Sequence, residues 1–172
     1  MYYDDDGGVA RATPTCDETS AGLVGAFAQV GVGGYVKVPE NNASAVMAAL
    51  VGAGPLAINV DASQWSDYES GVFSGCSYAD MDLDHIVQLV GYGTDADSGL
   101  DYWLVRNSWD FSWGEQGYIR LLRDPLDATP CGVDKQPQDG TGCAGAEVQY
   151  PCGQCAVVFD ASYPTDVAVV AP

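Results

Sequence analysis

The chain has 172 residues, of which 47% are hydrophobic, 17% are charged and 21 are glycines. This composition is too apolar for an acidic disordered tail, and it has too much glycine and too little charge for a coiled coil. Six basic and 24 acidic residues give a net charge of −18, so we expect neither nucleic acid nor a membrane as a partner. The length matches one domain of ordinary size.

The pattern along the chain predicts one short helix and several strands. Asn41 or Asn42 can cap the helix, apolar residues then recur every three or four positions, and Gly52 and Gly54 end it. Segments rich in β-branched and aromatic residues predict strands at 32–38, 56–61, 86–92, 102–106, 118–123 and 156–160. These elements favour an α+β fold, mainly an antiparallel sheet or half-open barrel with one short helix.

Residues 124–155 break this pattern, because they are rich in aspartate, glycine, proline and cysteine and show little periodicity. We interpret them as a cysteine-stapled insertion within a single domain that covers residues 1–172. The cysteines at 131, 143, 152 and 155 also permit a zinc site, since four thiolates suit a tetrahedral ion. Only the last two have the close spacing of zinc ligands, so disulfides are favoured, and six cysteines in all favour an oxidising compartment.

The chain has one histidine, His85, which follows an acidic run and opens a predicted strand. Asn107 ends another predicted strand. If the two strands are antiparallel neighbours, the Asn107 amide can orient the imidazole while a nearby indole excludes water from their hydrogen bond. A histidine and an orienting amide are two members of a Cys-His-Asn nucleophilic system. A lone histidine, taken by itself, is more often a structural residue.

The acidic run before His85 contains Asp80, Asp82 and Asp84 at alternate positions, as a calcium-binding loop does. It lacks the glycine and the bidentate glutamate of such a loop, so we interpret it as a solvated turn. No metal and no other cofactor is expected.

Segments around His85 and Asn107 resemble those of papain-like cysteine peptidases, the cathepsin L and papain family. The resemblance rests on residues 84–93, 102–109 and 112–120, with further landmarks in the same order at 54–55, 61–63, 68–73 and 161–164. It covers most of the chain, and the Asn-Ser-Trp block at 107–109 is highly specific. It implies the barrel-like C-terminal lobe of the papain-like fold, and peptide-bond hydrolysis as the activity.

The resemblance also implies residue roles. His85 is the base that forms the thiolate–imidazolium pair and later protonates the leaving amine, and Asn107 orients its imidazole. Trp109 shields this pair, and Trp113 forms part of the leaving-group side of the cleft.

Further residues are expected to contact the substrate. Ile86 and Asn59 fall where the family builds one wall of its main specificity pocket, and Asn59 replaces a small apolar residue there. Asp84 is expected to face the substrate beside them. Asp110 and Phe111 replace the usual Gly-Thr-like turn.

The catalytic cysteine departs from the family pattern. The family's histidine and asparagine lie about 130–150 residues after it, but only 84 residues precede His85. None of the six cysteines has a Cys-Gly-Ser-Cys-Trp-like context. We therefore expect a helical lobe absent from this chain to provide the catalytic cysteine and the oxyanion glutamine. Residues 1–31 resemble the crossover between the lobes, with Cys16 left unpaired.

The resemblance further implies that Cys76 pairs with a cysteine near the C-terminus. Cys131 matches that partner when counted forward from the strand at 117–123, and Cys155 matches it when counted back from 163–164. We predict the Cys76–Cys131 pair. Expected partners are a peptide or protein substrate, the helical lobe, and a propeptide or protein inhibitor, and the expected location is lysosomal, vacuolar or secreted, although no signal peptide is visible.

The alternative interpretation is a non-catalytic papain-like binding or regulatory domain. Without the other lobe, a large apolar face of this half would be exposed, and such faces usually mark an interface. A pure binding domain has no need to keep a histidine, an asparagine and two tryptophans together, so the peptidase interpretation is preferred. The isolated chain is expected to be inactive.

Overall fold

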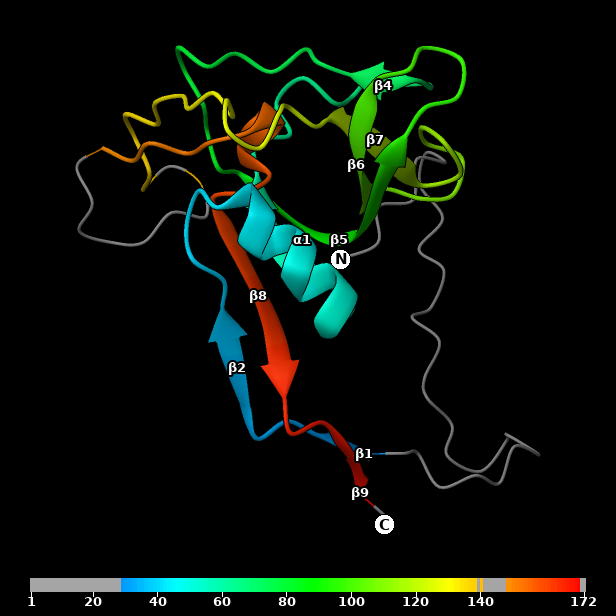
Figure 1. Cartoon of the computed structure of the whole chain (residues 1–172), viewed down its shortest axis with the longest axis vertical. Coiled ribbons are helices and arrows are strands. Elements are labelled where there is room, and N and C mark those ends of the chain that lie inside the picture. The colour runs from blue at the N-terminus through cyan, green and yellow to red at the C-terminus, as the bar shows by residue number, and fades with distance from the viewer. Residues whose placement is uncertain (1–28, 139, 141–147, 171–172) are drawn as a thin grey trace, which may run out of the picture. The chain divides into compact units, whose positions relative to one another are not determined.

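The computed structural model describes residues 29–138, 140 and 148–170, and a seven-stranded sheet is its largest element (Figure 1). The strands of this sheet are β2 Gly34–Lys37, β3 Leu56–Val60, β4 Val72–Phe73, β5 His85–Thr94, β6 Asp101–Arg106, β7 Tyr118–Leu122 and β8 Asp160–Thr165. They lie in the order β2-β8-β3-β5-β6-β7-β4. Neighbouring strands are antiparallel except β4 and β7, which are parallel.

A two-stranded antiparallel pair joins β1 (Gln29–Gly31) to β9 (Ala168–Val170) and belongs to a unit of its own. Residues 1–28, most of the predicted crossover with Cys16, lie outside the described residues, as does Cys143. In the part of the chain that is described, no helix has the length and hydropathy that a membrane crossing requires.

The seven-stranded sheet bends at strand β5. Its first half pairs with β3, with Val60 opposite His85, and its second half pairs with β6. The register shifts between Leu89 and Gly91, and an irregularity of this kind bends a strand and increases its twist. Figure 1 shows β5 curving below β6. The sheet therefore curls toward the half-open barrel that the sequence predicts.

The core lies between this curled sheet and helix α1 (Ala43–Gly52), which packs against β5 (Figure 1). Alternate residues of the strands face inward, and burying each such side chain stabilises the fold by roughly 1.5–3 kcal/mol. The largest fully buried apolar side chains are Trp65, Trp103, Leu56, Ile58, Leu83, Leu89, Ile119, Leu121, Val46, Val60 and Val105. The predicted α+β class, mainly antiparallel sheet with one α-helix among the described residues, is confirmed.

Helix α1 lies where the sequence predicts it. The side-chain oxygen of Asn42 accepts a hydrogen bond from the Ala45 amide at 2.9 Å, which satisfies one free donor of the first turn. At the other end the Gly54 amide donates to the Leu50 carbonyl, and Gly54 has a φ of +102°. Glycine adopts this conformation without strain, so it ends the helix.

The predicted strand at 156–160 is wrong. Residues Gln154–Ala156 form a short 3₁₀ helix, η1, and β8 begins only at Asp160. The apolar run after Cys155 has strand-like composition, but the amides of Ala156, Val157 and Phe159 each donate to the carbonyl three residues back and make turns. Strand β8 contains Pro164, which usually argues against a strand. Here Pro164 pairs with β2 alone, because β3 reaches only residues 160–162.

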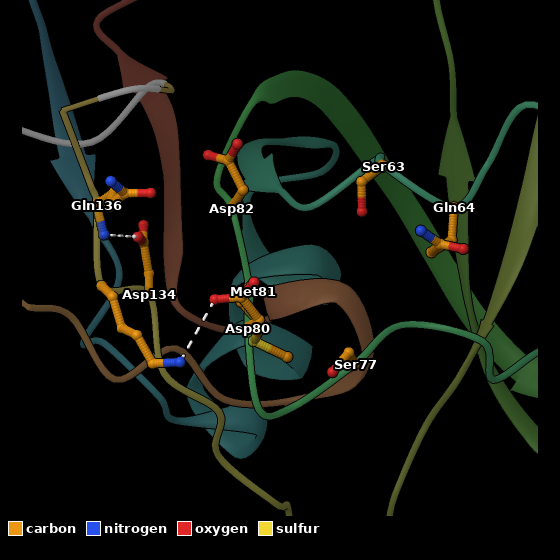
Figure 2. Close-up of a pocket in the computed structure, with 9 residues that line it drawn as sticks. Ser63, Gln64, Ser77, Asp80, Met81, Asp82, Asp134 and Gln136 are labelled. Atoms are coloured by element: carbon orange, nitrogen blue, oxygen red, sulfur yellow. Dashed lines mark hydrogen bonds and ion pairs between the residues drawn. The ribbon is translucent and has the colours of Figure 1, made fainter.

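Residues 124–153 form no strand in the part that is described, and they lie against the segment before β5 (Figure 2). The Met81 amide donates to the Val133 carbonyl at 2.9 Å, and the Val133 amide donates to the Tyr78 carbonyl at 3.0 Å. The insertion is therefore held by backbone hydrogen bonds to the chain that leads into His85.

The predicted Cys76–Cys131 disulfide is wrong. Cys76 bonds to Cys155, and Cys131 bonds to Cys152 within the insertion. Counting back from residues 163–164 therefore identifies the partner of Cys76 correctly as Cys155. Counting forward fails because the insertion lies between the strand at 117–123 and this partner. The zinc interpretation is also contradicted, since three of its four thiolates are consumed in these two bonds.

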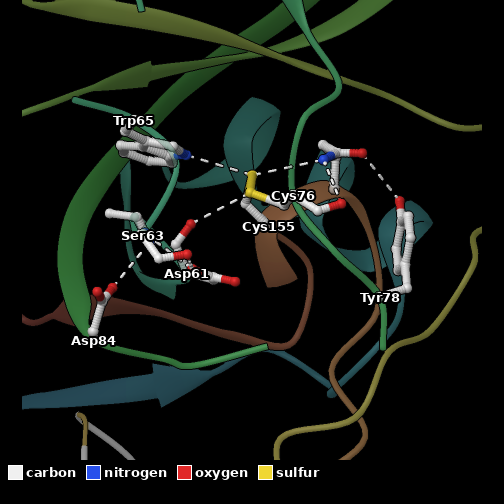
Figure 3. The surroundings of a disulfide bond; sticks show 9 residues. Asp61, Ser63, Trp65, Cys76, Tyr78, Asp84 and Cys155 are labelled. Atoms are coloured by element: carbon white, nitrogen blue, oxygen red, sulfur yellow. Dashed lines mark hydrogen bonds between the residues drawn. A yellow bond between two sulfur atoms is a disulfide. The ribbon is translucent and has the colours of Figure 1, made fainter. Parts of the chain in front are cut away.

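The Cys76–Cys155 bond ties the segment before β5 to η1 (Figure 3). The Trp65 indole donates to Cys155 Sγ at 3.4 Å, and the Asp61 amide donates to the Cys155 carbonyl at 3.1 Å. This disulfide therefore also fixes the loop that follows β3.

Replacing both members of a disulfide by serine should lower the free energy of unfolding by an amount that grows with the closed loop. The 79-residue separation of Cys76 and Cys155 predicts a loss of about 4.5 kcal/mol, and the 21-residue separation of Cys131 and Cys152 predicts about 3 kcal/mol. Urea unfolding of the two double variants measures both losses. Peptide mapping without reduction provides the control, and recovery of a linked 76–131 peptide would contradict the pairing.

Candidate active site

His85 and Asn107 lie side by side at one end of the β5–β6 pair. His85 is the first residue of β5, and Asn107 directly follows β6. The antiparallel register, with Gln88 opposite Arg106, brings these two ends together. His85 Nε2 and Asn107 Oδ1 are 2.8 Å apart. The structure therefore contains the hydrogen bond that the sequence leads us to expect.

The surroundings of Asn107 assign the histidine tautomer. Its Oδ1 also accepts from the Ser108 amide at 2.7 Å, and because a backbone N–H can only donate, the amide atom at this position is the oxygen. The same oxygen can accept from His85 only if Nε2 carries a proton. The neutral imidazole therefore keeps its lone pair on Nδ1, the nitrogen turned away from Asn107. Asn107 Nδ2 is buried and has no partner among the described residues.

Three tryptophans surround this pair. The Trp109 ring centroid lies 5.3 Å from that of His85, and the buried Trp65 meets the imidazole edge-on at 6.2 Å. Trp113 stacks on Trp65 at 6.2 Å and donates from its indole to the Trp65 carbonyl at 3.2 Å. Such apolar surfaces keep water from the hydrogen bond and strengthen it.

The sequence analysis missed Trp65. It lies in a stretch of serine, glutamine and aspartate that follows β3, where a turn was the natural interpretation. The available signal was the residue itself, because a large aromatic residue in a polar turn needs a place to bury its ring.

Ion pairs between side chains stabilise the turn that carries Trp113. Arg120 donates to both oxygens of Glu115, from Nε at 2.7 Å and from Nη2 at 2.5 Å, and its Nη1 reaches Asp95 at 2.5 Å. The hydrogen bond from Arg120 holds the pKa of Glu115 below its usual value, against the opposing effect of burial. Hydrogen bonds from Ser98, with a further one from Arg120, lower the pKa of Asp95 to about 2.

Asn59 and Ile86 are register partners on β3 and β5, so the structure brings these two predicted substrate residues together. The Ile86 side chain is 59% exposed. The Asn59 amide is half-buried and donates to the Asp160 carboxylate of β8. The surface at this register position is thus apolar at Ile86 and polar at Asn59, and its contact with a substrate stays a prediction.

Asp84 is engaged within the chain. Its Oδ1 accepts from the Ala62 amide at 2.9 Å, which fastens the loop after β3 to the residue before His85. A substrate contact of Asp84 stays a prediction.

The four cysteines that the structure describes are all oxidised in disulfides, so none of these four offers a thiolate to His85. Over the described ranges, no group of three or more histidine, cysteine, aspartate or glutamate side chains is placed to hold a metal ion. The site as described contains an imidazole, an amide hydrogen-bonded to it and aromatic rings packed around the imidazole.

The single histidine makes the tautomer directly measurable. In a ¹⁵N-histidine spectrum of the neutral form, we expect Nε2 to be protonated and Nδ1 to be unprotonated. Asn107→Ala should remove the acceptor and give a mixture of tautomers, whereas Asn59→Ala, a matched change at a nearby asparagine, should not. A wild-type spectrum with the proton on Nδ1 would contradict the assignment.

The Glu115–Arg120 pair predicts an acid-sensitive contribution to stability. Because the folded-state pKa of Glu115 is lowered, its contribution is complete above the usual carboxyl range and is lost as the pH falls through the lowered pKa. Glu115→Gln should reduce the free energy of unfolding at pH 7 by about 1 kcal/mol. It should also make the fall of this free energy between pH 5 and pH 3 less steep. Urea midpoints across that range test this, with the exposed Glu69→Gln as control. An unchanged acid slope in the Glu115 variant would refute it.

The chain matches the family model described as papain family cysteine protease over residues 2–141. Cathepsin L of Sarcophaga peregrina is 43% identical over 102 residues, which are 58% of this chain and 29% of that protein. Vignain of Vigna mungo is 42% identical over 113 residues, 64% of this chain and 29% of that protein. The chain thus spans less than a third of the length of these relatives.

Solved structures agree. The bromelain protease from Ananas comosus, in complex with the E64 inhibitor, is 35% identical with a TM-score of 0.56 over 78% of this chain and 50% of that one. Digestive procathepsin L 3 of Tenebrio molitor is 31% identical with a TM-score of 0.55 over 77% of this chain and 35% of that one. This likeness confirms the predicted papain-like fold, and the curled sheet and helix are consistent with its C-terminal lobe. The chain therefore belongs to the papain family of cysteine proteases.

Proposed function

We propose that this chain is the histidine- and asparagine-bearing C-terminal part of a papain-like cysteine endopeptidase. The observation that carries the proposal is the hydrogen bond between His85 Nε2 and Asn107 Oδ1, which leaves Nδ1 as the basic nitrogen. In the proposed roles, His85 is the catalytic base, Asn107 orients it and Trp109 shields their hydrogen bond. The whole enzyme hydrolyses peptide bonds.

The proposed chemistry uses both imidazole nitrogens. Nδ1 accepts the proton of a cysteine thiol, and the resulting thiolate attacks the substrate carbonyl carbon. The imidazolium then protonates the leaving amine as the acyl–enzyme forms, and a water molecule, deprotonated by the same nitrogen, hydrolyses it. Throughout, the Nε2–H donates to Asn107 Oδ1, so the ring cannot rotate away from the reacting atoms.

The nucleophile and the oxyanion glutamine are proposed to come from a helical lobe on another polypeptide segment. The four described cysteines are oxidised in disulfides, which supports a nucleophile from outside this part of the chain. Residues 1–31 are proposed to form the crossover between the lobes within the single-domain arrangement. A propeptide or protein inhibitor is the further partner that the proposal includes.

Asn59, Ile86 and Trp113 are proposed to contact the substrate. The Asn59–Ile86 pair exposes an isoleucine beside a polar amide, which supports a mixed wall for the main specificity pocket. Trp113 covers the leaving-group side. The two disulfides support an oxidising location, lysosomal, vacuolar or secreted.

Co-expression with a helical-lobe chain of a papain-like peptidase tests the proposal. A fluorogenic peptide should show no turnover with this chain alone and thiol-dependent turnover with the pair. His85→Ala in the active pair should lower kcat/KM by at least about 10³-fold, because the base acts as a unit with the nucleophile. Asn107→Ala should lower kcat more than it raises KM.

The rival function, a non-catalytic binding domain, is favoured by the exposed apolar side chains of Ile86 and Trp109. It predicts tight association with the helical lobe and no turnover. Thiol-sensitive turnover by this chain alone, lost in His85→Ala, would instead show that the nucleophile lies within the chain.

A further inference from the structure

A cavity of about 450 Å³ opens between three segments of the chain (Figure 2). Three segments line it. The loop after β3 contributes Ser63 and Gln64, the segment before β5 contributes Asp80 and Asp82, and the insertion contributes Asp134 and Lys135. We call this cavity the acidic pocket, since three carboxylates face one ammonium group in it.

Lys135 does not neutralise the acidic pocket. Its Nζ lies 3.6 Å from Asp80 Oδ1, and both side chains are largely exposed, so the attraction between them is weak. The contact nevertheless shows that an ammonium group on a flexible stem reaches a carboxylate of the pocket from inside it.

Asp134 gives the pocket a buried acceptor. The residue is 1% exposed, and its Oδ1 accepts from the Gln136 amide at 2.9 Å. Its Oδ2 is buried without a hydrogen-bond partner in the described part of the chain. A carboxylate oxygen held away from water without a donor is costly. A cation in the pocket would offset this cost.

The arrangement suits an organic cation better than a metal ion. Asp134 stands on the opposite side of the pocket from Asp80 and Asp82 (Figure 2). Within the described residues, no three acidic groups come close enough to share a metal ion. A guanidinium group spreads five donors over a plane, and an ammonium group on a long stem carries three, so either can meet separated oxygens.

Two chain connections place the pocket next to the reacting groups. Gln64 directly precedes Trp65, whose ring lies against His85 and stacks on Trp113. Asp82 lies three residues before His85, and the Ala62–Asp84 hydrogen bond joins these two walls. These connections favour a position of the pocket on the side of His85 where Trp113 lies.

We propose that the acidic pocket binds a lysine or arginine side chain of the peptide substrate on the leaving-group side of the scissile bond. This inference rests on the proposed function for its direction, because Trp113 defines the leaving-group side. The insertion provides one wall, so this preference is a property of this chain.

Binding of blocked peptides to the intact chain tests the pocket without any nucleophile. Acetyl-Ala-Arg-Ala-amide should bind about three- to tenfold more tightly than the same peptide with citrulline, a neutral analogue of arginine of the same shape, as measured by calorimetry at low salt. Equal affinities would overturn the proposal. A competition with calcium chloride gives a second test. If calcium binds the chain and displaces the arginine peptide from the wild type and from Asp80→Asn to the same extent, the proposal is also overturned.

Two substitutions should act in opposite directions. Asp80→Asn should weaken binding of the arginine peptide about two- to fivefold, and Lys135→Gln should strengthen it by a similar factor, because it removes an internal competitor. Neither exposed change should disturb folding. Asp97→Asn, an equal charge change in the exposed β5–β6 turn, is the control. If Asp97→Asn weakens binding as much as Asp80→Asn does, net charge alone explains the binding and the pocket is refuted.

Asp134→Asn should weaken binding most, provided that its circular dichroism spectrum and melting temperature match those of the wild type.

In an active two-chain enzyme, Asp80→Asn should lower kcat/KM only for substrates with arginine after the scissile bond. An equal loss with arginine before the bond would contradict the assigned side. Failure to reconstitute turnover would weaken the proposed function and leave the arginine–citrulline difference intact, so the two proposals fail separately.

Discussion

The hydrogen bond between His85 and Asn107 depends on the register of two strands. His85 is the first residue of β5, and Asn107 is the first residue after β6, so the two side chains meet only when these strands are paired as observed. A slip of one residue would turn each side chain to the other face of the sheet. The shift between Leu89 and Gly91 fixes where β5 bends, and the first half of the strand is held by β3. The core that sets this register therefore also sets the geometry of the site.

Local signals made much of this predictable. The helix has a capping asparagine and glycines at its end, the central strands have β-branched runs, and the block around Asn107 is specific enough to identify the partner of His85. Features that depend on contacts between distant parts of the chain were not predicted correctly. The turn at Cys155 reads as a strand until its disulfide and hydrogen bonds are seen, and the insertion hid the partner of Cys76. Trp65 was missed because its role comes from rings elsewhere in the chain.

The insertion changes what lies beside the reacting groups. Its own disulfide and two backbone hydrogen bonds to the chain at 78–81 place Asp134 and Lys135 in the wall of the acidic pocket. The sheet positions His85 and Asn107, the proposed base and orienting amide. The insertion adds charged side chains to the acidic pocket. If the pocket binds the peptide as proposed, a change in the sequence of the insertion would alter which peptide binds and would leave the His85–Asn107 hydrogen bond untouched.

The same geometry explains why the chain by itself is an incomplete catalyst in the proposed enzyme. The Trp109 side chain is 40% exposed, so the aromatic surface beside His85 is partly open to solvent. Water near a hydrogen bond weakens it, and a low local dielectric strengthens it. A second lobe docked on this face would exclude that water while it brings the thiol to Nδ1. Assembly of the two lobes would therefore complete the thiol–imidazole pair and at the same time exclude water from the His85–Asn107 hydrogen bond that orients the imidazole.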